Sequence, residues 1–374
     1  MRLALLGAFA FPSPQGSQAY LAAQARALRD AGAEVAIVCY GRGAAAGSDL
    51  EGIDVVRAPR ALSPRSLRSG PRLAKPGADA ALALTLLAAH RRRRFDAVLA
   101  HNAEAAAVAL AVRPQLRRPV VYVVHTLAEC ELETYAPAAF ATALRPIGAR
   151  LDRTLARRAD ALLVLSRAAE RALGGAARGP LARIPPALAA GDPPAPDAIA
   201  AACLRRGLEP ARFALYAGNL DRYQDLGALA AAARRVELPV VVATHGTGVA
   251  PPPLRTLRVE DAAEARRLLF GAALALLPRR APGGFPVKLL NYMEAARAIA
   301  ARAAVADTLE HRRSAWLLDD DAPADAWAGA IRALAADPSL AAELGAGARR
   351  TLAREHDPTH LAHRTLDFVR PLVR

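Results

Sequence analysis

Apolar and polar positions follow two alternating patterns along this chain. Short, nearly continuous apolar runs, such as residues 2–9 and 34–41, are typical of buried parallel strands. Between these runs lie longer stretches, such as residues 19–33, in which apolar residues recur every three or four positions and predict helices. Because this strand–helix order repeats through most of the chain, we expect an α/β fold with parallel sheets.

A proline-rich stretch interrupts the series. Residues 182–201 contain five prolines, and a second strand–helix series begins after them. We therefore expect two Rossmann-like domains, of residues 1–190 and 191–355, and a C-terminal helix over 356–374 that packs back on the first domain. Two α/β domains joined in this way form a cleft, where a ligand is expected.

Composition restricts the class of protein. Apolar residues make up 53% of the chain, which excludes a disordered protein. The three cysteines, Cys39, Cys130 and Cys203, are widely spaced, which favours a reduced, cytoplasmic protein. No apolar run reaches 18 residues, so we expect no membrane span. The first residues resemble a short signal peptide, but the strand, loop and helix pattern that follows favours a folded N-terminal segment.

Positive charge is concentrated in the first half. The net charge is +15, and residues 1–190 carry 26 basic and 14 acidic side chains. This excess suggests an anionic partner, whereas an arginine-rich surface inherited from a GC-rich genome explains it equally well. Residues 57–75 hold six basic residues and no acidic one, which predicts an exposed loop and a peripheral contact with an anionic membrane. Only 17 of 374 residues are aromatic, so we expect no nucleic-acid partner.

Residues 281–299 contain one of only two lysines in the chain. The Gly283–Gly284 pair permits close backbone approach, and Pro286 suits the first turn of a helix. A cation in a first turn is unfavourable to the helix itself, so Lys288 is interpreted as a residue placed for an anion such as a phosphate. The alternative is an exposed lysine on a surface turn.

Polar residues also follow the predicted strands, where ligands of open α/β sheets bind. They are the pair His101 and Asn102, His125, and His245. Gly16, at a predicted turn after the first strand, marks a further place where a ligand could approach. A structural role for the histidines remains an alternative. No pair of metal-ligand residues shares a helix face, so no metal site is expected. Dinucleotide-binding, P-loop and nucleophile-elbow motifs do not occur.

Several segments together resemble the retaining, nucleotide-sugar-dependent glycosyltransferases of the GT-B fold, in the large family 4 group (glycosyltransferase group 1). The similar segments are residues 11–38, 121–126, 159–166, 182–188, 215–232, 283–296 and 335–349. The resemblance implies two domains facing each other across a cleft. It implies transfer of a sugar, with retention, from a nucleotide diphosphate-sugar to a hydroxyl of a glycan or lipid-linked acceptor. It also implies no metal or other cofactor beyond this co-substrate, and a catalytic role for His125.

The sequence departs from the family at four charged positions. Two glutamates usual in the donor helix are replaced by Gly283 and Asn291, and a usual arginine and lysine by Asn219 and Gln224. If the site is used, Asn291 contacts the ribose and Lys288 holds the diphosphate. The substrate-binding residues expected are Gly16, His101, Asn102, Asn219, Arg222, Gln224, His245, Arg279, Gly283, Gly284, Phe285, Lys288 and Asn291. The alternatives are a catalytically degenerate protein that binds nucleotide-sugar or glycan without turnover, and an epimerase on a related fold.

Overall fold

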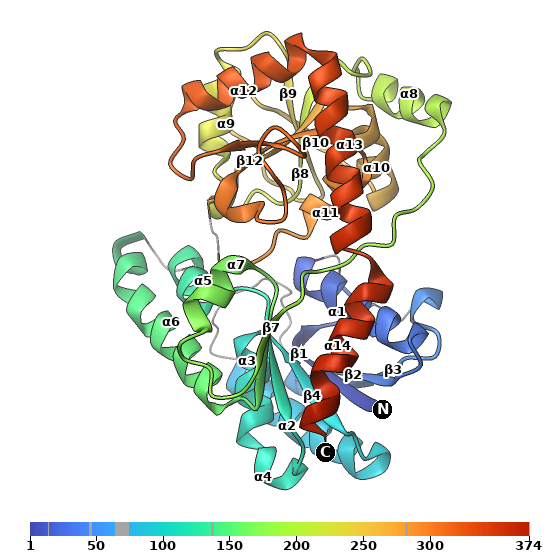
Figure 1. The fold of residues 1–374 in the computed structure, drawn as a ribbon, viewed down its shortest axis with the longest axis vertical. Helices are drawn as coiled ribbons and strands as arrows, with labels where there is room; N and C mark the ends of the chain where they lie inside the picture. The colour runs from blue at the N-terminus through green and yellow to red at the C-terminus, as the bar shows by residue number, and fades with distance from the viewer. Residues whose placement is uncertain (14, 45–46, 64–74, 136–137, 281–282, 374) are drawn as a thin grey trace. The chain divides into compact units, whose positions relative to one another are not determined.

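The computed structural model describes every residue except 14, 45–46, 64–74, 136–137, 281–282 and 374 (Figure 1). The chain forms two compact units. The first contains Met1–Ala187, Gly283–Phe285 and Pro358–Arg374, and the second contains Leu188–Pro282 and Pro286–Asp357. Each unit has its own parallel sheet, which confirms the α/β class with two parallel sheets.

The sheet of the first unit has the strand order β3-β2-β1-β4-β5-β6-β7. Its central strand β1 pairs in parallel with β2 and β4, so that Leu5 lies between Ile37 and Leu99. The strands are β1 (Arg2–Ala10), β2 (Glu34–Tyr40), β3 (Asp54–Arg57), β4 (Ala97–His101), β5 (Val120–Val124), β6 (Ala161–Val164) and β7 (Leu181–Arg183).

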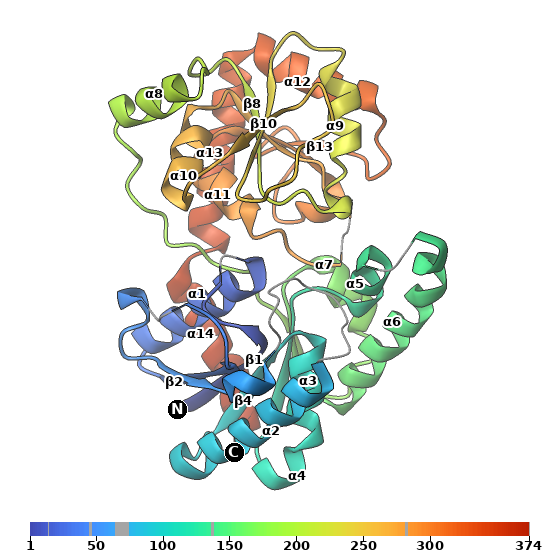
Figure 2. The same ribbon diagram turned by 180° about the vertical axis from the view of Figure 1, so that it is seen from behind.

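Helices cover both faces of this sheet. Helices α1 and α14 pack against each other, and α2 and α3 lie on the opposite face (Figures 1 and 2). The helices are α1 (Gly16–Asp30), α2 (Lys75–Arg93), α3 (Asn102–Ala111), α4 (Arg113–Leu116), α5 (Ala128–Tyr135), α6 (Ala138–Arg158), α7 (Arg167–Leu173) and α14 (Pro358–Val369), with short 3-10 turns η1 (Ser48–Leu50), η2 (Arg60–Leu62) and η5 (Arg370–Leu372).

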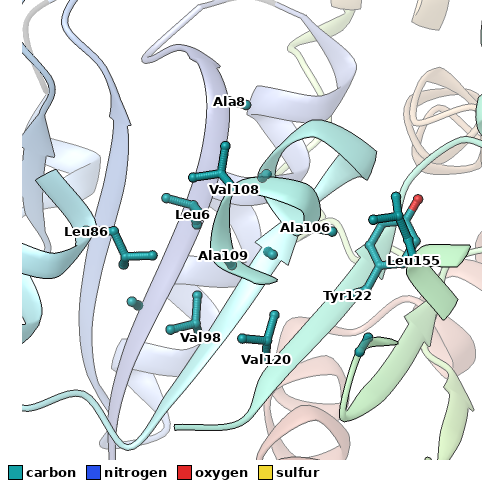
Figure 3. Close-up of a cluster of buried hydrophobic side chains, with 14 of the residues drawn as sticks. Leu6, Ala8, Leu86, Val98, Ala106, Val108, Ala109, Val120, Tyr122 and Leu155 are labelled. Atoms are coloured by element: carbon teal, nitrogen blue, oxygen red, sulfur yellow. The ribbon is translucent and has the colours of Figure 1, made fainter. Parts of the chain in front are cut away.

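The core of the first unit explains the continuous apolar runs of the sequence. Leu6, Val98 and Val120 come from three neighbouring strands and are fully buried. Ala106 and Ala109 of α3 pack over them (Figure 3). Because helices cover both faces of the sheet, almost no position of a central strand faces water.

The second unit repeats this arrangement with a smaller sheet, of order β10-β9-β8-β11-β12-β13. Its strands are β8 (Ala214–Ala217), β9 (Val240–Thr244), β10 (Arg255–Arg258), β11 (Leu274–Leu277), β12 (Ala298–Arg302) and β13 (Trp316–Leu318). Its helices are α8 (Pro196–Arg205), α9 (Leu226–Ala233), α10 (Ala262–Gly271), α11 (Lys288–Glu294), α12 (Ala324–Ala336) and α13 (Pro338–Glu355), with 3-10 turns η3 (Arg222–Gln224) and η4 (Ala303–Val305). Within the described ranges, no helix has both the length and the apolar character needed to cross a bilayer.

Local chemistry sets where several helices begin. Pro338 ends the preceding helix, because it cannot continue a helical hydrogen-bond ladder. The Asp337 carboxylate then accepts a hydrogen bond of 2.9 Å from the Leu340 amide and caps α13. In contrast, α11 begins at Lys288, two residues later than the expected start at Pro286. Lys288 nevertheless lies in the first turn of its helix, as expected.

Candidate functional site

In the first unit, two histidines from neighbouring strand ends contact each other. His101 is the last residue of β4, and His125 directly follows β5. Because β4 and β5 are adjacent and parallel, their carboxyl ends bring the two imidazoles together. His101 Nδ1 lies 2.8 Å from His125 Nε2, a hydrogen-bond distance. We refer to these two residues as the histidine pair.

The surroundings of the histidine pair are buried and uncharged. Tyr20 of α1 packs edge-on against His125, with ring centroids 4.9 Å apart. Burial lowers the pKa of His125 to about 3 and lowers that of His101 well below its usual range, so both imidazoles are neutral near pH 7. Two buried atoms beside the pair, His101 Nε2 and the Tyr20 hydroxyl oxygen, have no hydrogen-bond partner among the described residues. Such atoms offer hydrogen-bonding capacity to a bound ligand.

Two further predicted residues lie in this unit. Gly16 is the exposed first residue of α1, so it belongs to the helix and not to the preceding turn. Asn102 is the first residue of α3 and has φ of 74°, a left-handed conformation that asparagine tolerates better than most residues. It follows His101 directly, so the chain turns sharply away from the sheet next to the histidine pair.

The Gly283–Phe285 segment packs against residues that follow β5. Gly284 forms an antiparallel bridge with Thr126, and the Leu127 amide donates a hydrogen bond of 2.8 Å to the Gly283 carbonyl. A Cβ atom on Gly283 would lie 2.5 Å from Cys130 Sγ, which is closer than atoms can pack. Gly284 is equally confined, against the His125 carbonyl. The two glycines therefore permit close approach to protein backbone and to Cys130, and their contact with a ligand stays a prediction.

In the second unit, Lys288 lies against the end of β8. Its Nζ donates a hydrogen bond of 2.6 Å to the Tyr216 hydroxyl and lies 4.3 Å from the centre of the Tyr216 ring. Gly218 provides the space, because a Cβ atom there would overlap the ammonium group. Lys288 is half-buried, and no salt bridge to it is formed within the described part of the chain. We call Tyr216, Gly218, Asn219, Asp221 and Lys288 the lysine cluster.

The electrostatics of the lysine cluster favour an added anion. Burial, followed in importance by the nearby Arg279 charge, lowers the pKa of Lys288 well below its usual range. The Asp221 carboxylate acts in the opposite direction and is itself partly buried, which raises its pKa. An anion bound at Nζ would stabilise the charged form of the lysine.

The two neutral replacements, Asn219 and Gln224, bind each other. Gln224 Nε2 donates a hydrogen bond of 2.7 Å to Asn219 Oδ1, and Asn219 Nδ2 donates one of 2.6 Å to the Asp221 carboxylate. The Tyr216 hydroxyl in turn donates to the Asn219 carbonyl at 2.7 Å. The loop after β8 is therefore held by a series of hydrogen bonds between neutral groups, and this series ends on the Asp221 carboxylate.

A buried ion pair, which the sequence analysis missed, anchors the same loop. The guanidinium of Arg302, fully buried at the end of β12, donates to the Asp225 carboxylate at 2.6 Å and to the Pro278 and Asp320 carbonyls. Exposed Arg280 shares the Asp225 carboxylate, also at 2.6 Å. In the sequence, Asp225 looks like an ordinary helix cap before α9, so its position gave no signal of this pair.

The remaining predicted residues of the second unit lie around this loop. Arg222, His245 and Asn291 are exposed, and the Arg279 guanidinium stacks over the Tyr223 ring at 5.1 Å. A cavity of about 230 Å³ is lined by residues 220–222, 225–227 and 249–251. The glutamate of α11, Glu294, is buried and paired with Arg266 at 2.9 Å, so it does not replace the missing pair of carboxylates.

Comparison with known proteins gives a match to one family model over part of the chain, and a fold. Residues 15–187 match the model of the glycosyl transferase 4-like domain. A sucrose-phosphate synthase from Thermosynechococcus elongatus shares the fold with a TM-score of 0.81 at 17% identity, over 99% of this chain and 98% of its own. Anabaena HepE, solved in complex with UDP-glucose, has a TM-score of 0.73 at 16% identity, over 100% of both chains.

A third solved structure agrees with these two. A glycosyltransferase from Rickettsia africae has a TM-score of 0.71 at 10% identity, over 100% of this chain and 98% of its own. A search of curated proteins gives no match. At these identities the likenesses establish the fold, and they confirm the expected GT-B architecture over the whole chain.

Proposed function

Because residues 15–187 form a glycosyl transferase 4-like domain in a chain of GT-B fold, we propose that this protein transfers a sugar from a nucleotide diphosphate-sugar to an acceptor hydroxyl. Transfer proceeds with retention of the anomeric configuration. The donor binds the second unit, and the acceptor, a glycan or a lipid-linked sugar, binds the first. Support comes from HepE, which was solved with UDP-glucose, UDP and glucose.

The observation that carries the proposal is the state of Lys288. Its ammonium group is held by the Tyr216 hydroxyl and ring, and no carboxylate among the described residues forms a salt bridge with it. Holding a half-buried cation without a counter-ion is costly, so such a site favours an anionic ligand. In the proposed function this anion is the donor diphosphate, with Arg279 as a second cation and Asn291 on the ribose.

The chemistry that follows is electrostatic. Departure of the nucleoside diphosphate leaves negative charge on its terminal phosphate oxygen, which Lys288 stabilises. The catalytic role of His125 is that of a neutral polar group, since burial lowers its pKa to about 3. No carboxylate can act from position 283, because Cys130 occupies the space of a side chain there. The residues described here supply the charge stabilisation without a metal ligand set.

The first test uses nucleotides as probes. UDP, GDP and UDP-glucose are added separately, and the thermal midpoint is measured, because a ligand that binds only the folded protein must raise it. We expect one nucleotide to raise the midpoint in the wild type and in Lys75→Ala, but less in Lys288→Ala. Lys75 is a matched control, since it is the only other lysine and pairs with Glu104 in the first unit. Equal shifts in both variants contradict the donor site.

A second test separates a transferase from a degenerate binding protein. UDP-glucose is incubated with the enzyme and a mixture of glycan and lipid-linked acceptors, and free UDP is measured. Acceptor-dependent UDP release is expected for a transferase. Stabilisation by UDP-glucose without any release supports the degenerate alternative.

Contact with an anionic membrane is part of the proposal. Helix α6 supports this contact better than the basic loop of residues 57–75 does. Of that loop, residues 64–74 lie outside the described residues, and Arg57 is bonded to the Phe11 and Ala44 carbonyls. On α6, Ile147 and Leu151 are 58% and 40% exposed and lie one turn apart. Five exposed arginines lie on the same helix: Arg145, Arg150, Arg153, Arg157 and Arg158.

Packing fixes which face of α6 is exposed. Gly148 lies against the Glu129 backbone, where a side chain would not fit. The buried Asp152 accepts hydrogen bonds from the Ala128 and Glu129 amides, at 3.0 and 3.1 Å. With these residues facing inward, the apolar pair and the arginines face outward. A basic face with exposed apolar residues is typical of helices that lie on anionic lipid.

Vesicle co-sedimentation tests this contact. We expect binding to phosphatidylglycerol vesicles that weakens with salt and is lost in the double variant Ile147→Ser, Leu151→Ser. The control is Leu84→Ser, which removes a leucine that is 69% exposed on α2. An equal loss in the control, or equal binding to neutral phosphatidylcholine vesicles, contradicts the role of α6.

A further inference from the structure

One of the two facing nitrogens of the histidine pair carries the hydrogen of their shared hydrogen bond. The surroundings of the pair decide which one. A neutral imidazole carries one N–H and one lone pair, so only one of the two facing nitrogens can hold a proton. If His101 Nδ1 donates, the proton of His125 is on Nδ1 and His101 Nε2 is a bare acceptor. If His125 Nε2 donates, the proton of His101 is on Nε2 and His125 Nδ1 is the bare acceptor.

The burial of His101 Nε2 separates the two arrangements. This atom is buried and has no hydrogen-bond partner within the part of the chain that the structure describes. In the second arrangement it would be a buried N–H without an acceptor, whereas in the first it is only a lone pair without a donor. Buried N–H groups without acceptors are rarer in folded proteins than acceptors without donors. The first arrangement therefore costs less.

We propose that His101 is a positioning residue that fixes the proton of His125 on Nδ1, which makes His125 a neutral hydrogen-bond donor to a substrate oxygen. His101 occupies the Nε2 lone pair of His125, at 2.8 Å. His125 therefore has no free lone pair with which to accept a proton, and it does not act as a general base. The identity of the oxygen, on the donor sugar or on the acceptor, rests on the proposed transferase function, but the proton position does not.

Two observations agree with this assignment. Burial keeps both imidazoles neutral, so a doubly protonated histidine does not supply the shared proton. Among the described residues, the His125 side chain forms one hydrogen bond, at Nε2, which leaves Nδ1 for a ligand. Its residual exposure of 5% shows that the ring is not completely enclosed, whereas His101 is at 0%.

The test is nuclear magnetic resonance of protein labelled with ¹⁵N-histidine, at pH 7 and without ligand. Long-range ¹H–¹⁵N spectra distinguish the two protonation sites of an imidazole, and His125→Gln identifies the signal that belongs to His125. We expect His125 to be protonated on Nδ1, which is the less common form in water. A wild-type spectrum with His125 protonated on Nε2 overturns the proposal.

Two substitutions of the partner sharpen the test. In His101→Gln the side-chain amide can still donate to His125 Nε2, so the Nδ1 proton should stay. In His101→Leu no donor remains, so the proton should move to Nε2. An unchanged His125 spectrum in His101→Leu contradicts the positioning role.

A kinetic measurement connects the proton position to catalysis. With UDP-glucose as donor, UDP release should fall roughly 2- to 10-fold further in His101→Leu than in His101→Gln, the size of one neutral hydrogen bond. Equal rates in the two variants contradict a catalytic effect of His101. If no UDP is released by the wild type, the proposed function fails, while the spectra still decide the proton position.

Discussion

The histidine pair and the lysine cluster occupy corresponding places in their units but differ in the charge and the hydrogen bonding of their polar groups. Both lie at the carboxyl ends of central parallel strands. The histidine pair is neutral, and His101 Nε2 has no hydrogen-bond partner among the described residues. The lysine cluster contains formal charges, and its polar groups are connected to one another through Tyr216, Asn219 and Asp221.

This difference indicates which ligand each cluster suits. Uncharged groups with unused hydrogen-bonding capacity suit a neutral partner such as a sugar hydroxyl, because nothing must be displaced when it binds. Among the described residues, the Lys288 ammonium donates one hydrogen bond, to the Tyr216 hydroxyl, so its other N–H groups suit an anion. The first cluster thus suits an uncharged ligand and the second an anionic one.

The largest expected effect concerns the Asp225 carboxylate, which anchors the loop of the lysine cluster. Asp225→Ala removes the carboxylate partner of fully buried Arg302 and should lower the free energy of unfolding by about 3 kcal/mol. Arg280→Ala removes the exposed partner of the same carboxylate, 62% exposed, and should cost less than about 1 kcal/mol. Urea denaturation of both variants measures their free energies of unfolding. Equal losses would show that the buried pair is no more important than the surface one.

The second prediction tests the anion preference directly. Lys288→Ala should weaken UDP binding roughly ten- to a hundredfold, the value of a charge-assisted hydrogen bond. Calorimetric titration measures the affinity, with Lys75→Ala as the control that should bind as the wild type does. Because the pKa of Lys288 is lowered, rising pH removes the charge and should weaken binding in the wild type but not in Lys288→Ala. Unchanged UDP affinity in Lys288→Ala would mean that Lys288 does not contribute to nucleotide binding.

The third prediction tests the neutrality of the histidine pair. The pKa of His125 is about 3 in the folded protein and near 6.5 when unfolded, so the unfolded state binds more protons as pH falls below 6.5. Its contribution to stability is therefore present above pH 6.5 and is lost towards pH 3. Between pH 7 and pH 5 the loss should be about 2 kcal/mol.

The contribution of His125 to stability must be separated from those of groups with the opposite pH dependence. Burial raises the pKa of Glu131 to about 7 and that of Asp152 to about 6, and both groups favour the folded state as pH falls. The measurement is therefore the difference between the wild type and His125→Gln in urea denaturation at pH 7 and pH 5. The wild type should lose about 2 kcal/mol more than the variant. Parallel pH dependence would mean that His125 is solvated and chargeable.

The smallest expected effect concerns exposed Asn291. Asn291→Ala should weaken UDP binding by about 0.5–1.5 kcal/mol, the value of one neutral hydrogen bond. If the amide contacts the ribose, then 2′-deoxy-UDP should bind the wild type more weakly than UDP but bind the variant about as well as UDP does. Calorimetry with both nucleotides decides this point. An equal preference for UDP in both proteins places Asn291 away from the 2′-hydroxyl.

The sequence predicted regular features better than specific contacts. Continuous apolar runs predicted the central strands of both sheets, because a parallel strand covered on both faces is apolar at nearly every position, whereas the short edge strand β7 was not predicted. The strand-end positions of His101 and His125 were predictable too, but their contact depends on the adjacency of β4 and β5. The pair of Asp225 and Arg302 joins residues 77 positions apart, so no local pattern marks it.

Two features depend on packing that the sequence does not show. Neighbouring protein atoms fill the space of a side chain at Gly283 and Gly284, so packing alone accounts for glycine there, and their role in ligand binding stays a prediction. The outward face of α6 was not predicted, because its direction depends on where Gly148 and Asp152 are buried. In both cases the missing information was which neighbour lies opposite a residue.

The contact between Gly283 and Cys130 also restricts how this chain could change over time. A glutamate introduced at 283 collides with Cys130 Sγ at 2.5 Å and with its Cβ at 2.9 Å, so that substitution alone disturbs packing before any carboxylate can act. Shortening Cys130 first removes a packed side chain and brings no benefit by itself. Each single step is therefore unfavourable, and only the two together would introduce an acidic side chain at this position. The residue at 283 is thus coupled to Cys130, and neither position can be changed to that end without the other.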